Sequence, residues 1–207
     1  MTVGIIGAGN IGGTVARLAV AAGHDVVIAN SRGPDSLKDL VAELGPRAKA
    51  ATPAQAVAAG DIVVVAIPFR DREQLFKSGV DFRGKIVVDA MNPYAADFSI
   101  MDLGGRASAQ VVAEELPGAR VVKGFNTLYS KSLASSARPK VSPERIVLPI
   151  AGDDAVAKKT VAAFIDGVGY DPFDTGDLAG SLVQEPNAVL YNKPLTLPQA
   201  KAALVSA

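Results

Sequence analysis

The amino-terminal glycines of the chain have the spacing of a dinucleotide-binding turn. Gly7, Gly9 and Gly12 follow the β-rich run Thr2–Ile6 and open a segment whose apolar residues recur at helical spacing. In such a turn the first glycine permits a tight bend, the second lets a diphosphate approach the backbone, and the third lets the helix pack closely on the strand. The chain has 20 glycines, so the spacing alone is weak evidence, because such a triplet can occur by chance. Its position between a strand and a helix favours a dinucleotide over a purely structural turn.

The loop after the next apolar strand indicates which dinucleotide is bound. An acidic residue there, about 20 residues beyond the glycines, would hold the ribose 2′-hydroxyl of NAD. This chain has Asn30, Ser31 and Arg32 at that place, so no carboxylate repels a 2′-phosphate and a guanidinium can bind one. The pattern predicts NADP(H) as the cofactor. The alternative is that Arg32 is an ordinary solvated loop residue, and Lys38 either adds a second positive charge or is an exposed helix residue.

Three further loops are predicted at the same edge of the sheet. The corner Ala66, Ile67 and Pro68 offers an apolar wall for a flat ring of the cofactor, although Pro68 can equally serve only to end a strand. Two later loops are candidates for the nicotinamide and acceptor pocket. They consist of Met91, Asn92 and Pro93, and of Phe125, Asn126 and Thr127. Turn and capping roles remain open for their polar residues.

Reduction of a carbonyl needs a proton donor beside the hydride acceptor, and this chain has few candidates. The single histidine, His24, precedes a strand, and five strand residues at about 3.3 Å each place it roughly 16 Å from the cofactor edge. Asp61 fails for the same reason, and Asp89 fits a loop-ordering hydrogen bond as well as a catalytic role. The remaining donors are Lys123, Tyr129 and Lys131. Because the candidates are so few, no residue is assigned as catalytic. Their scarcity favours direct hydride transfer between two planar cofactors that the protein aligns.

Alternating strand-like and helix-like segments must position these loops. Apolar runs predict strands at 2–6, 25–29, 62–67, 86–88, 121–122 and 146–151. Amphipathic segments predict a helix after the glycine turn and further helices at 37–44, 53–59, 108–116 and 153–165. Asp35 or Ser36 is the expected cap of the second helix. The alternation predicts the α/β class, with a doubly wound, mostly parallel Rossmann sheet.

The chain is expected to divide into a core and a smaller appendage. Residues 1–123 are predicted to form the NADP-binding core, and residues 124–207 to complete the sheet and form a small carboxy-terminal lobe that closes the acceptor site. Segments 94–106 and 124–144 are long for simple connections, so we expect them to be functional or to contain short helices.

Composition excludes several classes of function. The 207 residues include 21 Lys and Arg, 21 Asp and Glu, one His and no Cys. Disulfide scaffolds, cysteine nucleophiles and thiolate or histidine metal clusters are therefore excluded, and no metal is expected. Zero net charge gives no electrostatic argument for nucleic acid or a membrane as a partner. The expected partner is a small-molecule redox acceptor and the expected location is cytoplasmic, while a homodimer is left open.

Several motifs taken together resemble the NADPH-dependent reductases of coenzyme F420, an 8-hydroxy-5-deazaflavin. The similarity covers most of the chain. Its motifs are Ile5-Ile6-Gly7-Ala8-Gly9-Asn10-Ile11-Gly12, Asn30-Ser31-Arg32, Ala66-Ile67-Pro68, Asp89-Ala90-Met91-Asn92-Pro93, Val121-Val122-Lys123-Gly124-Phe125-Asn126-Thr127 and Ala151-Gly152-Asp153-Asp154. The resemblance implies hydride transfer between NADP(H) and coenzyme F420 as co-substrate.

The same resemblance implies roles for individual residues. Asn10 and Ile11 would bind the diphosphate together with the glycines, Ser31 and Arg32 would bind the 2′-phosphate, and Ile67-Pro68 would contact the flat rings. Residues 91–93 and 125–126 would border the nicotinamide and the deazaflavin. The carboxy-terminal part departs from the family, which often has Pro after the glycine of the segment that reads Asp174-Thr175-Gly176-Asp177 here.

Two other functions fit the same residues. One is an NADPH reductase of a flavin, a quinone, an imine or a ketone. The other is a non-catalytic NADPH-binding module, for which the scarcity of acid and base groups also argues.

Overall fold

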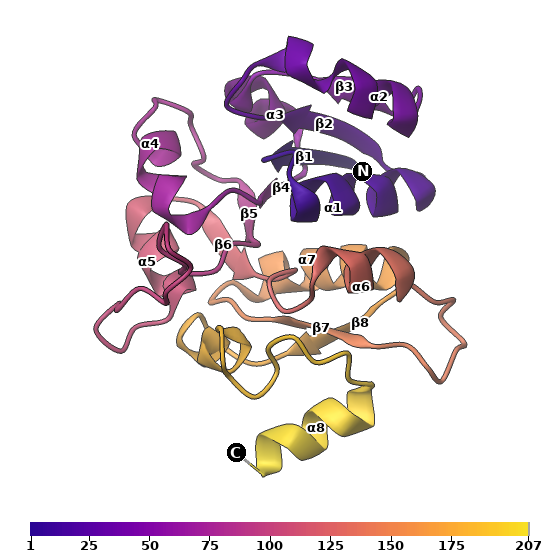
Figure 1. Cartoon of the computed structure of the whole chain (residues 1–207), viewed down its shortest axis with the longest axis vertical. Helices are drawn as coiled ribbons and strands as arrows, with labels where there is room; N and C mark the ends of the chain where they lie inside the picture. Colours follow the sequence, from indigo (N-terminus) through magenta and orange to yellow (C-terminus); the bar gives the residue numbers. More distant parts are fainter. Residues whose placement is uncertain (207) are drawn as a thin grey trace.

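The computed structural model describes residues 1–206, which fold around one six-stranded parallel sheet (Figure 1). Its strands are β1 (Thr2–Ile6), β2 (Asp25–Ala29), β3 (Ala48–Ala50), β4 (Ile62–Val65), β5 (Ile86–Asp89) and β6 (Arg120–Lys123). Their order is β3-β2-β1-β4-β5-β6, so the winding direction reverses between β1 and β4. This confirms the predicted doubly wound Rossmann fold and places a crevice at the carboxyl ends of β1 and β4.

The central strands are buried on both faces, which explains their continuous apolar runs. Alternate residues enter two different cores, with Ile5 and Val64 in one and Ile6 and Val65 in the other. The first core is covered by α1 (Asn10–Ala21), α2 (Lys38–Leu44) and α7 (Ala155–Gly167). The second is covered by α3 (Pro53–Ala59), α4 (Arg72–Phe76) and α5 (Ser108–Glu115).

The last third of the chain does not add a strand to the main sheet. β7 (Val147–Ile150) and β8 (Asp171–Asp174) form a separate two-stranded parallel sheet, joined to β6 by a single antiparallel bridge between Lys123 and Ala151. The expected completion of the sheet by residues 146–151 is therefore wrong. Each of the two strands contains a proline, Pro149 or Pro172, and proline cannot donate to a second neighbour, which confines such strands to an edge.

Short helical elements complete the carboxy-terminal part. They are α6 (Ser130–Ser135), the 3₁₀ helix η3 (Ala179–Gln184) and α8 (Leu197–Val205). Figure 1 shows α8 beyond the β7–β8 sheet, on the side away from the main sheet. Within residues 1–206 no helix combines the length and the apolar character that a membrane-spanning segment requires.

The segment after β2 differs locally from the expectation. Residues Pro34–Leu37 form the 3₁₀ helix η1, so α2 begins at Lys38 and neither Asp35 nor Ser36 caps it. The Ser36 hydroxyl instead accepts from Asn30 Nδ2 (2.8 Å) and donates to the Gly33 carbonyl oxygen (2.8 Å). The polar residues expected at the helix terminus therefore order the turn after β2.

Gly12 is a position where the fold depends directly on the absence of a side chain. A Cβ atom there would lie 1.8 Å from the carbonyl oxygen of Gly7. We expect Gly12→Ala to lower the free energy of unfolding by about 1–3 kcal/mol, the usual range for overpacking, in urea denaturation. The matched control is Gly13→Ala, whose Cβ would meet the flexible Arg17 guanidinium at 3.2 Å and the Ala8 carbonyl oxygen at an ordinary contact distance of 3.8 Å. The stability of this variant should not fall. Equal stability of Gly12→Ala and the wild type would contradict this packing argument.

Candidate functional site

The glycine turn joins β1 to α1 in the way the spacing predicts. Gly7 has φ 104°, which favours glycine, and a Cβ there would lie 2.3 Å from the Ala66 carbonyl oxygen. Gly9 is different, because a Cβ there would have no neighbour within 4 Å. No side chain caps α1 and its first turn contains no acidic residue. Its first backbone N–H groups are therefore free to bind an anion.

A pocket of about 500 Å³, the larger pocket, opens beside this turn. Its lining includes the ends of three neighbouring strands, contributed by residues 6–9 at the end of β1, 30–32 after β2 and 66–68 after β4. The other lining residues are Pro53, Asp71, Gln74, Leu75 and Ser78, which the sequence analysis did not identify. Its volume lies within the range of about 300–1,000 Å³ that is typical of small-molecule sites. The fold therefore brings the predicted glycine, Arg32 and proline segments to one cavity.

Arg32 is exposed at the mouth of this pocket. Its backbone N–H donates to Asn30 Oδ1 (3.0 Å), and no hydrogen bond or ion pair of its guanidinium is found among residues 1–206. Lys38, by contrast, pairs with Asp35 at 3.0 Å and does not line the pocket. Asn30 has an ordering role, since its side chain binds both the Arg32 backbone and Ser36. The turn is thus fixed while its guanidinium is left without a partner in this part of the chain.

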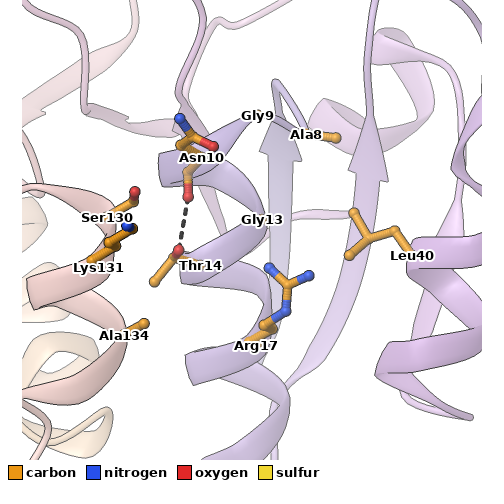
Figure 2. A pocket seen from close by; sticks show the side chains of 10 residues that line it. All are labelled: Ala8, Gly9, Asn10, Gly13, Thr14, Arg17, Leu40, Ser130, Lys131 and Ala134. Atoms are coloured by element: carbon orange, nitrogen blue, oxygen red, sulfur yellow. Dashed lines mark hydrogen bonds between the residues drawn. The ribbon is translucent and has the colours of Figure 1, made fainter.

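Asn10 faces a second cavity of about 380 Å³, the smaller pocket, which lies along α1 (Figure 2). Ser130, Lys131 and Ala134 of α6 form one side of it, Arg17 extends from α1 itself, and Leu40 lies on the side of α1 opposite to α6. Lys131, a candidate proton donor, therefore lies near Asn10. Arg17 is already paired with Glu43 (2.5 Å). Ile11 lines neither pocket and packs partly against the core.

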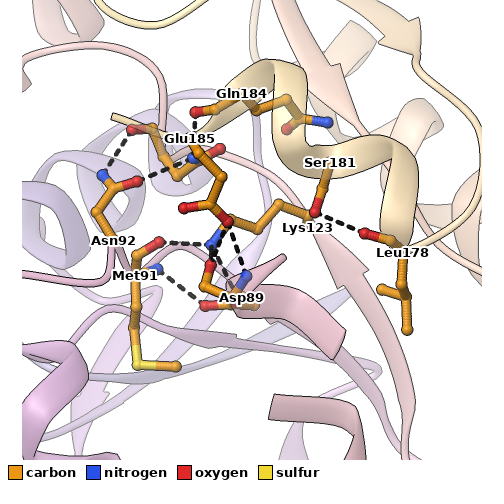
Figure 3. A network of polar contacts seen from close by, with 10 residues as sticks. Asp89, Met91, Asn92, Lys123, Leu178, Ser181, Gln184 and Glu185 are labelled. Carbon is orange, nitrogen blue, oxygen red and sulfur yellow. Dashed lines mark hydrogen bonds and ion pairs between the residues drawn. The ribbon is translucent and has the colours of Figure 1, made fainter. Parts of the chain in front are cut away.

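A buried ion pair lies where β5 and β6 end, and Figure 3 shows its surroundings. Lys123 Nζ donates to Asp89 Oδ2 (3.0 Å), to the Met91 carbonyl oxygen (2.6 Å) and to Ser108 Oγ (2.9 Å). An ammonium group has three protons, so all three have acceptors. Lys123 and Asp89 are both 0% exposed. Lys123 is therefore removed from the candidate proton donors, and Asp89 has the loop-ordering role.

The two candidate acceptor loops are clamped to each other through their amides. Asn92 Nδ2 donates to the Asn126 carbonyl oxygen (2.9 Å), and Asn126 Nδ2 donates to Asn92 Oδ1 (3.0 Å) and to the Gln184 carbonyl oxygen (2.9 Å). The Met91 and Phe125 side chains are buried in the two different cores. Phe125 also has φ 61°, a left-handed conformation that is uncommon outside glycine.

Neither pocket is lined by the residues predicted for the acceptor site. These residues are Met91, Asn92, Pro93, Phe125, Asn126 and Thr127. Their loops do follow β5 and β6, one and two strands beyond the Ala66–Pro68 wall of the larger pocket. Their role beside an acceptor stays a prediction.

The other ionisable candidates lie as follows. His24 precedes β2, at the amino ends of the strands, where its ring packs on Phe164 (5.6 Å between centroids) and burial lowers its pKa. Asp61, at the same end, accepts the Thr2 N–H (2.8 Å). Tyr129 is 63% exposed. Residues 1–206 contain no cluster of three metal-binding side chains.

One pair near the acceptor loops was not foreseen. The Tyr94 hydroxyl donates to the Tyr191 hydroxyl (3.1 Å). Burial raises the pKa of Tyr191 well above its ordinary value. Tyr94 directly follows Pro93, whereas Tyr191 belongs to the carboxy-terminal segment. The two residues are 97 positions apart, so no local pattern could pair them.

Known proteins share this fold and these motifs. Residues 2–93 match the family described as NADP oxidoreductase, coenzyme F420-dependent. A hypothetical protein from Sinorhizobium meliloti is 38% identical over 95% of both chains, with a TM-score of 0.86. A protein from Arthrobacter, described as a candidate F420-dependent NADP reductase, is 25% identical over 86% of this chain and 85% of its own, with a TM-score of 0.72.

A more distant structure shares the fold alone. It is a reductive aminase from Aspergillus terreus, solved with NADPH, which is 21% identical with a TM-score of 0.64. The match covers 87% of this chain and 56% of that enzyme. The chain belongs, through residues 2–93, to the family of NADP oxidoreductases described as coenzyme F420-dependent, and its glycine turn and strand order are those of an NADP-binding Rossmann oxidoreductase.

Proposed function

We propose that this protein transfers a hydride between NADPH and the deazaflavin coenzyme F420. The observation that carries the proposal is the larger pocket, in which an uncapped helix terminus and an exposed guanidinium meet at the ends of β1 and β2. The family match supports the choice of the deazaflavin as acceptor.

The residues present fit the adenosine half of NADPH. Gly9 leaves open the space through which a diphosphate would approach the amides of α1. Ser31 and Arg32 offer a hydroxyl and a charged fork to the 2′-phosphate. Ile67 and Pro68 form an apolar wall of the same pocket for a flat ring. With these groups at β2, β1 and β4, the nicotinamide half would extend toward the ends of β5 and β6.

The chain itself contributes alignment rather than acid–base chemistry in this proposal. When bound, NADPH would supply a hydride: a C–H bond of the reduced nicotinamide breaks, a C–H bond forms on the deazaflavin ring with both electrons, and a solvent proton completes the reduction. No side chain has to deliver that proton, which agrees with the full hydrogen bonding of Lys123. The clamped loops after β5 and β6 would hold the two rings at reacting distance, about 3–3.5 Å.

The first test of this proposal concerns the guanidinium. Arg32→Ala should weaken NADPH binding roughly 10- to 150-fold, corresponding to about 1.5–3 kcal/mol for a lost charged hydrogen bond, and should leave NADH binding nearly unchanged. Isothermal titration with both nucleotides measures the difference. Lys38→Ala is the matched control, because that lysine is paired with Asp35 away from the pocket. Equal losses of affinity for NADPH and NADH would show that Arg32 does not bind the 2′-phosphate.

The second test of this proposal concerns Gly9. Gly9→Ala should keep the stability of the wild type, because its Cβ would have no neighbour within 4 Å among the described residues. It should weaken NADPH and NADH to a similar extent, by about 5- to 150-fold if the clash with the diphosphate costs about 1–3 kcal/mol. Thermal denaturation and nucleotide titration test the two halves separately. Full affinity in a normally folded variant would place the diphosphate elsewhere.

The third test of this proposal concerns the acceptor. With NADPH held constant, purified protein should reduce coenzyme F420, followed by the loss of deazaflavin absorbance, and should not reduce free flavins, quinones, imines or ketones at a comparable rate. Reduction of one of those compounds alone would identify a different reductase. Tight NADPH binding without turnover of any acceptor would identify a binding module.

A further inference from the structure

Lys123 occupies an unusual position for a lysine, because its ammonium is fully enclosed at the functional edge of the sheet. Fully buried lysines are rare unless they are paired, and an apolar replacement of a buried ion pair is often at least as stable. Stability alone therefore does not account for a charge at this place. The residues that the ammonium contacts indicate what it does.

The ammonium holds both backbone groups of Met91, either directly or through its partner. Its Nζ donates to the Met91 carbonyl oxygen at 2.6 Å, and Asp89 Oδ1 accepts the Met91 N–H at 3.0 Å. β5 continues the register of β4 at this point, with Ala90 N–H bonded to the Val65 carbonyl oxygen. Met91 is thus one strand, about 4.8 Å, from the strand that ends in the Ala66–Pro68 wall.

The same ammonium also reaches the carboxy-terminal segment through a second contact. Ser108 Oγ accepts from Lys123 and donates to Glu185 Oε1 (2.6 Å), and the Ser108 N–H donates to the same oxygen (2.9 Å). Glu185 is 9% exposed and directly follows η3. Next to it, the Gln184 carbonyl oxygen accepts from Asn126. One buried cation therefore connects the loop after β5, the start of α5 and the segment that packs over both.

The geometry points to Lys123 as a positioning residue that fixes the loop at Met91 and Asn92, and the segment around Glu185, against the nicotinamide half of the bound nucleotide. This inference rests on the proposed function for the direction in which the nucleotide extends. It does not depend on the identity of the acceptor. Lys123 acts through Met91 and Ser108 and touches no substrate itself.

The test removes the charges in a balanced way. The double variant Asp89→Asn, Lys123→Met eliminates both ions, so that neither is left unpaired in the core. Two probes are titrated: NADPH, and adenosine 2′,5′-bisphosphate, which has the 2′-phosphate but no nicotinamide half. We expect binding of the bisphosphate to stay within about twofold of the wild type. NADPH should lose about tenfold, equivalent to about 1.4 kcal/mol.

Hydride transfer gives a second readout. In the same variant the rate with saturating NADPH and coenzyme F420 should fall by about 100-fold, the effect expected when reacting groups shift by about 1 Å. Wild-type values for both NADPH affinity and rate in the folded variant would overturn the proposal. If the wild type reduces no deazaflavin, the proposed acceptor fails, and the comparison of the two nucleotides still decides the role of Lys123.

Two further variants separate positioning from stability. Ser108→Ala keeps both charges and removes one acceptor of the ammonium, and it should shift NADPH affinity in the same direction with the bisphosphate unaffected. If the double variant does not fold, this variant decides alone, and an unchanged NADPH affinity overturns the proposal. Arg145→Met removes another buried cation, which pairs with Asp166 and Asp171 at 2.9 Å each, and should lower stability without changing the ratio of the two affinities.

Discussion

The parallel pairing of β2, β1 and β4 determines where the larger pocket of this chain lies. In an all-parallel arrangement every carboxyl end reaches the same edge, and the reversal of strand order between β1 and β4 opens a crevice there. Ile6, Ala29 and Val65 stand in adjacent register, so the three loops that follow them meet without any long connection. The larger pocket is the space between those loops. Its position follows from backbone hydrogen bonding rather than from the side chains that line it.

Two cations at this edge have opposite surroundings. Arg32 is exposed, and its guanidinium has no partner among residues 1–206, as expected of a group that binds an anionic ligand. Lys123 is enclosed and all three of its protons are accepted by the chain. Desolvation makes a buried charge costly unless it is fully hydrogen-bonded. Arg32 is therefore available to bind a ligand, whereas the hydrogen bonds of Lys123 serve only to hold the chain together. Arg32 lies in an exposed turn after β2, whereas Lys123 is the last residue of the buried strand β6. Their places in the fold, rather than their residue types, distinguish their roles.

Local patterns explain which features could be predicted from the sequence. Gly7, Gly9 and Gly12 lie within one strand–turn–helix unit, and strand length alone places Arg32 at the cofactor edge and His24 at the opposite one. Nothing local pairs Ser108 with Glu185, which lie 77 residues apart, and the usual exposure of lysine argued against a buried Lys123. The sequence also did not predict that β7 lies outside the six-stranded sheet, because an apolar run indicates a strand but not the strand with which it pairs. Nonlocal contacts, and polar residues in apolar surroundings, account for most of what was missed.

The turn after β2 has a consequence for how this lineage can change. Asn30 and Ser36 hold its backbone, and Arg32 contributes only its main-chain N–H, and not its side chain, to that order. Under the proposed role of Arg32, the choice of coenzyme is therefore independent of the stability of the fold. A single codon change at position 32 would then redirect the enzyme from one cellular electron pool to another while the scaffold stays intact.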